Sequence, residues 1–127
     1  MSRRILIVED EENIVLSLQF LLKQSGYIVD VAPDGAAALR LISRKPDLVI
    51  LDVMLPDRDG YSICEAIRAN DAWRNTMVLM LTARGRDFDR EKGLALGADE
   101  YITKPFSNRD LMKRIEELLA ASPGVVN

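Results

Sequence analysis

Two spacings of apolar residues alternate along this chain of 127 residues, and this alternation limits the possible folds more than any other feature. Short runs of β-branched and apolar residues are typical of buried strands. Longer stretches with apolar residues three or four positions apart lie between them and are typical of helices with one buried face. The predicted strands are residues 5–8, 27–32, 48–51, 77–81 and 100–103.

The predicted order is therefore a strand followed by a helix, five times over. Nearly continuous apolar strands that alternate with amphipathic helices favour a parallel sheet with helices on both faces. Gly26 and Gly97 stand where helices should end, and Ser107 with Asp110 has the spacing of a helix N-cap. The length suits one domain, which we expect over residues 1–121, and residues 122–127 are predicted to form a frayed tail.

The composition excludes several kinds of site and partner. The chain has no histidine and a single cysteine, Cys64, which rules out Ser–His triads, histidine-ligated metals, internal disulfides and Cys-rich zinc sites. Lys and Arg number 17 against 20 Asp and Glu, a balance that argues against binding to nucleic acid or to a membrane. Few apolar residues follow the N-terminus, too few for a signal peptide, so we expect a cytoplasmic protein.

Polar side chains directly follow four of the five predicted strands. Glu9 and Asp10 follow the first strand, Asp52 the third, Thr82 the fourth and Lys104 the fifth. Each of these residues alone has a structural explanation, such as a turn, a helix N-cap or a solvated charge. Ligands of open α/β sheets bind beyond the carboxyl ends of the strands, so these side chains would converge if their strands are neighbours. Their joint placement therefore favours a functional site.

The chemistry of these side chains points to phosphoryl transfer. Three carboxylates without a histidine suit a hard divalent cation such as Mg²⁺. A carboxylate can also attack phosphorus and form an aspartyl phosphate. A metal ion, an ammonium group and a hydroxyl would supply the charge neutralisation and alignment that such a transfer needs.

Four sequence motifs carry a resemblance to a known family. In chain order they are ILIVEDEENI, PDLVILDVMLPDRDGY, VLMLTARG and GLALGADEYITKPFS. With them the chain resembles a bacterial two-component response-regulator receiver domain over about residues 3–121, and it is most similar to the receivers of winged-helix transcription factors. The resemblance implies a flavodoxin-like (βα)5 three-layer sandwich, an α/β fold whose parallel sheet has the strand order 2-1-3-4-5.

The resemblance also implies roles for the residues that would touch the phosphoryl group. Asp52 would be the phosphoacceptor, and Thr82 and Lys104 would contact the phosphoryl group. Tyr101 matches the aromatic residue that turns inward when the threonine hydroxyl moves to the phosphate. A cis peptide bond is expected between Lys104 and Pro105.

A magnesium ion is the cofactor that the resemblance implies. Asp10, Asp52 and the backbone carbonyl of Met54 would bind Mg²⁺ directly, and Glu9 would hold it through a water molecule. Met54 and Arg84 would flank the path of the water molecule that hydrolyses the aspartyl phosphate.

The expected partner is a sensor histidine kinase or a phosphotransfer protein. We expect a phosphoacceptor rather than an enzyme, one that promotes its own Mg²⁺-dependent phosphorylation and dephosphorylation. The fourth helix, fifth strand and fifth helix would form the output face, either as a phosphorylation-dependent homodimer or for another protein. In the dimer, Arg90 would pair with Asp110 and Glu100 with Arg114. The charged residues of this face are Arg90, Asp99, Glu100, Asp110 and Arg114.

Two other functions agree with part of this pattern. A phosphatase of the haloacid-dehalogenase type also uses an aspartate nucleophile and Mg²⁺. The motif of that family resembles DxD, with a second acid two residues after the nucleophile, but here Met54 stands two residues after Asp52. A flavodoxin-like FMN carrier shares the predicted fold, but the acidic run at residues 9–12 would repel its phosphate. Whether the chain acts alone or belongs to a longer regulator stays open.

Overall fold

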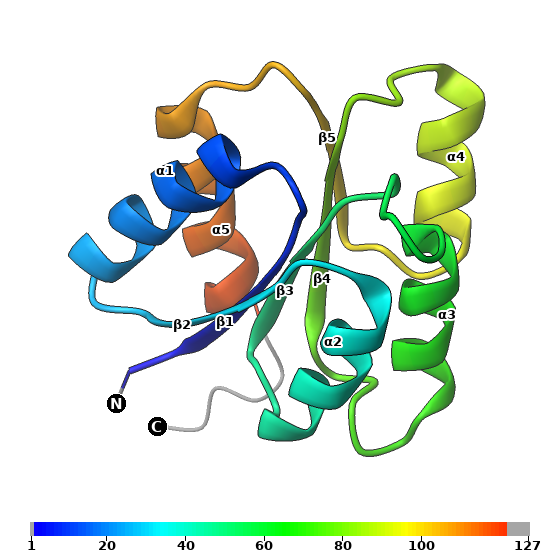
Figure 1. Cartoon of the computed structure of the whole chain (residues 1–127), viewed down its shortest axis with the longest axis horizontal. Helices are drawn as coiled ribbons and strands as arrows, with labels where there is room; N and C mark the ends of the chain where they lie inside the picture. The colour runs from blue at the N-terminus through cyan, green and yellow to red at the C-terminus, as the bar shows by residue number, and fades with distance from the viewer. Residues whose placement is uncertain (1, 122–127) are drawn as a thin grey trace.

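Five parallel strands form a single sheet in the computed structural model, which describes residues 2–121. The predicted tail, residues 122–127, lies outside the described residues. The strands are β1 (Arg4–Val8), β2 (Ile28–Ala32), β3 (Leu48–Leu51), β4 (Met77–Thr82) and β5 (Glu100–Thr103). Their order across the sheet is β2-β1-β3-β4-β5, which places β1, β3 and β4 in the interior (Figure 1).

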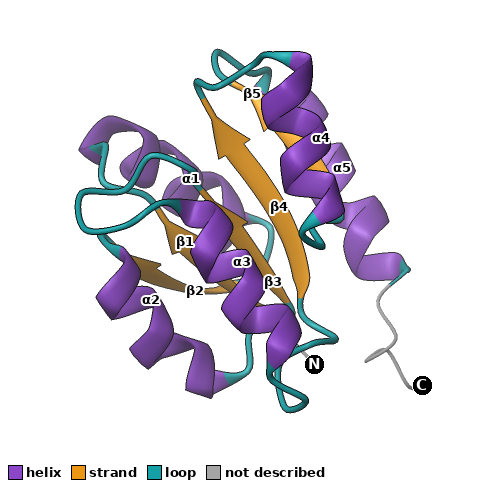
Figure 2. Cartoon of the chain, turned by 90° about the vertical axis from the view of Figure 1, so that its right-hand side faces the viewer, coloured by secondary structure: helices purple, strands orange, loops and turns teal. Residues whose placement is uncertain are grey.

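Helices cover both faces of this sheet. They are α1 (Glu12–Gln24), α2 (Gly35–Leu41), α3 (Gly60–Ala69), α4 (Asp87–Ala95) and α5 (Asn108–Ala120), and a short 3₁₀ helix (Ile42–Arg44) follows α2. Figures 1 and 2 show α1 and α5 on one face and α2, α3 and α4 on the other. The strand order and the three layers confirm the predicted fold. Over residues 2–121, no helix is both long enough and apolar enough to cross a membrane.

Alternate residues of each strand pack into different layers, as the period of two in a strand requires. In β1, Ile5 and Ile7 belong to the core under α1 and α5, whereas Leu6 and Val8 belong to the core under α2, α3 and α4. Burial on both faces explains why these strands are nearly continuous apolar runs in the sequence.

The predicted helix ends are also present. Gly26 and Gly97 follow the last turns of α1 and α4 with φ values of 91° and 111°, a backbone conformation that favours glycine. At the start of α5, the Ser107 hydroxyl accepts a hydrogen bond from the backbone N–H of Asp110 at 3.2 Å. The two glycines end helices at the loops that enter β2 and β5, and Ser107 starts α5 at the carboxyl end of the sheet, just after β5.

Candidate functional site

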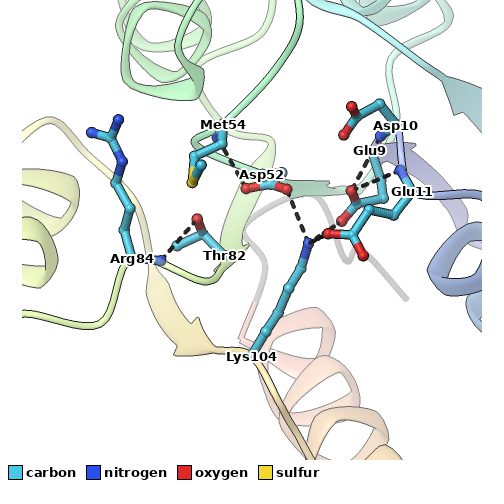
Figure 3. A network of polar contacts seen from close by, with 8 residues as sticks. All are labelled: Glu9, Asp10, Glu11, Asp52, Met54, Thr82, Arg84 and Lys104. Carbon is cyan, nitrogen blue, oxygen red and sulfur yellow. Dashed lines mark hydrogen bonds and ion pairs between the residues drawn. The ribbon is translucent and has the colours of Figure 1, made fainter.

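Three carboxylates gather where the adjacent strands β1 and β3 end (Figure 3). Glu9 and Asp10 follow β1, Asp52 follows β3, and one oxygen from each lies within 4.8 Å of the other two. Glu9 and Asp52 are only 3% and 4% exposed, whereas Asp10 is open to solvent. Every ligand atom in this group is a carboxylate oxygen, and such oxygens are the donors that Mg²⁺ prefers. The residues therefore fit the metal that the sequence predicts.

The ammonium group of Lys104 pairs with this cluster from the end of β5. Its Nζ lies 2.7 Å from Glu9 Oε1, 3.0 Å from Asp52 Oδ2 and 3.2 Å from Glu11 Oε1. Burial by itself would lower the pKa of Lys104, but the hydrogen bonds to Glu9 and Asp52 outweigh it and raise that pKa. Lys104 is therefore a permanent positive charge beside Asp52. The Lys104–Pro105 peptide bond is cis, as expected.

Glu9 is held from both of its oxygens. Oε1 accepts the hydrogen bond from Lys104, and Oε2 accepts the backbone N–H groups of Asp10 and Glu11, each at 3.1 Å. Burial raises the pKa of Glu9, and the bond from Lys104 opposes that effect. With both oxygens bonded to the protein, this carboxylate is fixed at the edge of the cluster.

Asp52 is positioned by backbone contacts on two sides. Its N–H donates to the carbonyl of Val8 at 3.0 Å, which continues the pairing of β1 with β3 by one residue. Its Oδ1 accepts the N–H of Met54 at 3.0 Å. Behind it, α3 begins so close that a Cβ on Gly60 would lie 2.2 Å from the Asp52 carbonyl oxygen, so only glycine fits there. The carboxylate is thus carried by a closely packed loop.

Thr82 and Tyr101 both bond to the backbone of one residue beyond β4, Arg84. The fully buried Thr82 accepts the N–H of Arg84 at its Oγ1, at 3.3 Å, and the Tyr101 hydroxyl donates to the Arg84 carbonyl at 2.6 Å. Tyr101 is 1% exposed, and its burial raises the pKa of the phenol. The Arg84 guanidinium points away from Asp52, whereas Met54, which is 51% exposed, lies beside Asp52 (Figure 3). Thr82 and Tyr101, the two residues expected to move on phosphorylation, are thus linked through the backbone of Arg84.

Four of the five residues predicted for the output face line one open groove of about 450 Å³: Arg90, Glu100, Asp110 and Arg114. Glu100 already has partners within the chain, since Arg114 Nε lies 2.6 Å from it and an Arg90 nitrogen lies 3.5 Å from it. The fifth, Asp99, lies outside this groove, where it pairs with Arg68 at 2.8 Å.

Two contacts of the site were not predicted from the sequence. Glu11 contacts Lys104, although the sequence marks it only as one member of an acidic run. Asp57 accepts the backbone N–H groups of Gly35 and Ala36 at 2.8 and 2.9 Å and so ties the loop after Asp52 to α2. The partners of both residues are far away in the sequence, and no local pattern marks such contacts.

Comparison with known proteins gives a consistent result. The family model described as response regulator receiver domain matches residues 5–116. The alkaline phosphatase synthesis transcriptional regulatory protein PhoP of Bacillus subtilis (strain 168) is 47% identical over 123 residues, which are 96% of this chain and 50% of PhoP. The chain therefore spans half the length of that relative.

Solved structures agree with the sequence relatives. A putative response regulator from Chloroflexus aurantiacus J-10-fl has a TM-score of 0.88 and 36% identity, and the match covers 94% of this chain and 99% of that one. The BeF3-activated DrrB receiver domain has a TM-score of 0.86 and 35% identity, with the same coverage of 94% and 99%. Both the fold and the sequence thus point to the same family.

Proposed function

Because this chain belongs to the response regulator receiver domain family of two-component systems, we propose that Asp52 is the residue on which it accepts the phosphoryl group. One observation carries the assignment: the Asp52 carboxylate is 4% exposed, it follows an interior strand, and it has Lys104 at 3.0 Å and two further carboxylates beside it. The family match also removes the reason to keep the phosphatase and FMN-carrier alternatives.

In the proposed transfer, an Asp52 carboxylate oxygen forms a bond to the phosphorus of the donor. The bond from phosphorus to the leaving atom breaks, and its electron pair stays with that atom, a histidine nitrogen in a protein donor or a carboxylate oxygen in acetyl phosphate. Lys104 is within hydrogen-bond distance of Asp52 and would neutralise one phosphoryl oxygen. The hydroxyl of Thr82 would turn away from the backbone N–H of Arg84 and donate a hydrogen bond to a second phosphoryl oxygen.

We propose Mg²⁺ as the cofactor of this site. Asp10, Asp52 and the carbonyl of Met54 would bind it directly, and Glu9 would hold it through water. The support is a set of three carboxylate oxygens within 4.8 Å of one another. When bound, Mg²⁺ neutralises negative charge on the transferring phosphoryl group. Among the four residues, Met54 is 51% exposed and Asp10 is open to solvent, so the ion can be reached from outside.

Receiver domains take their phosphoryl group from histidine kinases or phosphotransfer proteins, and we propose such a donor in the cytoplasm for this chain. The chain would act as a phosphoacceptor and not as an enzyme with a separate substrate. Met54 and Arg84 would flank the path of the water molecule that ends the phosphorylated state.

Intact-mass measurement with acetyl phosphate and Mg²⁺ tests the assignment of Asp52. The wild type should gain one phosphoryl group, and Asp52→Asn should gain none. Asp71→Asn is the matched control, because the Asp71 side chain is 91% exposed and pairs only with Arg74 among the described residues. An Asp52→Asn protein that still gained a base-labile phosphoryl group would show that another residue is the acceptor.

A further inference from the structure

Helix α3 starts directly on the peptide group of the proposed phosphoacceptor. The N–H of Gly60 donates to the carbonyl of Val53 at 2.7 Å, and the Cα of Gly60 is packed so closely on the Asp52 carbonyl that no side chain would fit between them. A displacement of the Asp52–Val53 peptide therefore has to move the first turn of α3, because closely packed groups cannot be compressed.

The next residue, Tyr61, carries this contact on to α4. Its side chain is 3% exposed, and its hydroxyl donates to the backbone carbonyl of Asp89 in the first turn of α4 at 3.0 Å. One turn later in α4, the ammonium group of Lys92 lies 4.5 Å from the centre of the Tyr61 ring. A cation above an aromatic ring adds to the attraction between the two helices. Tyr61 thus bonds α3 to α4 through both its hydroxyl and its ring.

Tyr101 reaches the same region from the sheet. Its hydroxyl is bonded to the carbonyl of Arg84, three residues before α4 begins, and its ring lies against Gly93 in α4, where a Cβ would come within 2.8 Å of it. The nearby Tyr61 hydroxyl adds to the effect of burial in raising the pKa of Tyr101. Two phenols, one from α3 and one from β5, therefore hold α4 and the loop before it.

We propose that Tyr61 is a positioning residue that couples the phosphorylation site to α4, in parallel with Thr82 and Tyr101. The route runs from the Asp52 peptide through Gly60 to the Tyr61 hydroxyl and the Asp89 carbonyl. This inference rests on the proposed role of Asp52. It makes α3 an active part of the response, because a packed helix moves as a unit when its first turn is displaced.

Hydrogen exchange of the α4 amides tests this coupling in Tyr61→Phe, which keeps the ring and removes only the hydroxyl. Without ligand, the α4 amides of this variant should exchange about fivefold faster than those of the wild type, the factor that corresponds to the net free energy of one neutral hydrogen bond. The decisive quantity is the ratio of exchange rates with and without Mg²⁺ and beryllium fluoride. In Tyr61→Phe this ratio should move toward one by about twofold or more. A purely structural role would raise both rates equally, and an unchanged ratio would overturn the proposal.

Two further variants complete the test. Tyr27→Phe removes a phenol hydroxyl outside this network and should leave the ratio at its wild-type value. The double variant of Tyr61→Phe with Tyr101→Phe should reduce the response more than either single variant, and a double variant equal to Tyr101→Phe alone would contradict a parallel route.

Calorimetric titration with Mg²⁺ and beryllium fluoride separates this proposal from the proposed function. Equal binding by the wild type and Asp52→Asn would contradict the role of Asp52. Normal binding with an unchanged exchange ratio in Tyr61→Phe would overturn only the coupling.

Discussion

At the scale of single residues, charge in the site is unevenly balanced. Lys104 contacts Glu9 and Asp52 but not Asp10, which is the exposed member of the three-carboxylate cluster. Asp10 would therefore contribute most of the electrostatic attraction for a cation bound there, because its carboxylate is not paired with the lysine. The other two are already stabilised by an ammonium group at hydrogen-bond distance.

Asp10→Asn should accordingly lower the affinity for Mg²⁺ by roughly tenfold or more, because loss of even an outer-shell partner of a metal costs about 10–100-fold and Asp10 is proposed as a direct ligand. The free energy of unfolding without metal should not fall, because the substitution removes one negative charge from a repulsive cluster. Calorimetric Mg²⁺ titration and urea unfolding measure the two effects. Glu12→Gln, in the same acidic run but outside the cluster, is the control. An unchanged titration in Asp10→Asn would exclude it as a ligand.

Asp57 gives a residue-scale prediction about pH. The hydrogen bond from Gly35, together with that from Ala36, lowers the pKa of Asp57 below its ordinary value. A carboxylate with a lowered pKa stabilises the fold above the pKa of the unfolded chain, about 4, and this contribution is lost as pH falls through the folded value. The stability difference between wild type and Asp57→Asn should therefore be present at neutral pH and disappear in acid. Urea unfolding across this range measures it, and a constant difference would contradict the assignment.

At the scale of elements, contact between the start of α3 and the loop after β3 is the tightest constraint around the site. Gly35 and Gly60 are both the first residue of a helix with an aspartate N-cap, yet their surroundings differ. A Cβ on Gly35 would meet the flexible side chain of Arg58, at 2.6 Å, whereas one on Gly60 would meet the backbone of Asp52. A side chain can move aside, but this backbone cannot without displacing the site.

Gly60→Ala should therefore destabilise the fold and impair phosphorylation, although alanine is ordinarily favoured over glycine in helices by up to about 1 kcal/mol. Gly35→Ala is the matched control and should cost much less, because Arg58 can adopt another rotamer. Urea unfolding and the phosphorylation rate with acetyl phosphate provide the comparison. Equal effects of the two substitutions would show that the contact at Gly60 is not special.

The elements themselves were largely predictable, for physical reasons. The sequence predicts all five strands to within a residue at each end. Burial on both faces makes the interior strands β1, β3 and β4 apolar runs, and the partly buried edge strands β2 and β5 still contain β-branched residues. Convergence of Glu9, Asp52 and Lys104 followed from parallel strands that end at one edge. The bond from Lys104 to Glu11 did not, because an exposed glutamate has the same local sequence whether or not it has a distant partner. The hydrogen bond from Tyr61 to α4 could not be predicted from the sequence either, since a buried helix position accepts many large residues.

At the scale of the whole molecule, the groove between α4, β5 and α5 offers a surface for assembly. Glu100 is bonded within the chain to Arg114 and Arg90, so pairing across a two-fold axis would require these side chains to exchange partners. Arg90 is the more exposed of the two arginines, at 51%, and ion pairs of exposed side chains contribute only about 0–1 kcal/mol each, so Arg90 can exchange its partner at little cost. A symmetric interface would repeat every pair twice.

We therefore expect phosphorylation to drive formation of a homodimer through this groove. Light scattering at micromolar concentration, with Mg²⁺ and beryllium fluoride, should detect a dimer of the wild type that Arg114→Glu abolishes. Arg74→Glu, which changes the same charge on a 62% exposed side chain outside the groove, should leave the dimer intact. A persistent monomer would favour use of this face for another protein, and a dimer insensitive to Arg114→Glu would place the interface elsewhere.

The order of the strands along the chain also determines when a newly synthesised copy has a complete candidate site. The bond from Lys104 to Glu9 joins residues 95 positions apart, and the bond from Lys104 to Asp52 spans 52 positions. β5 is the last strand in the sequence and the edge strand beside β4, so the lysine is synthesised only after the other four strands. A nascent or truncated copy that stops short of β5 has its aspartate but no ammonium group beside it. If Lys104 acts as proposed, we expect such unfinished copies to accept a phosphoryl group from the donor only slowly.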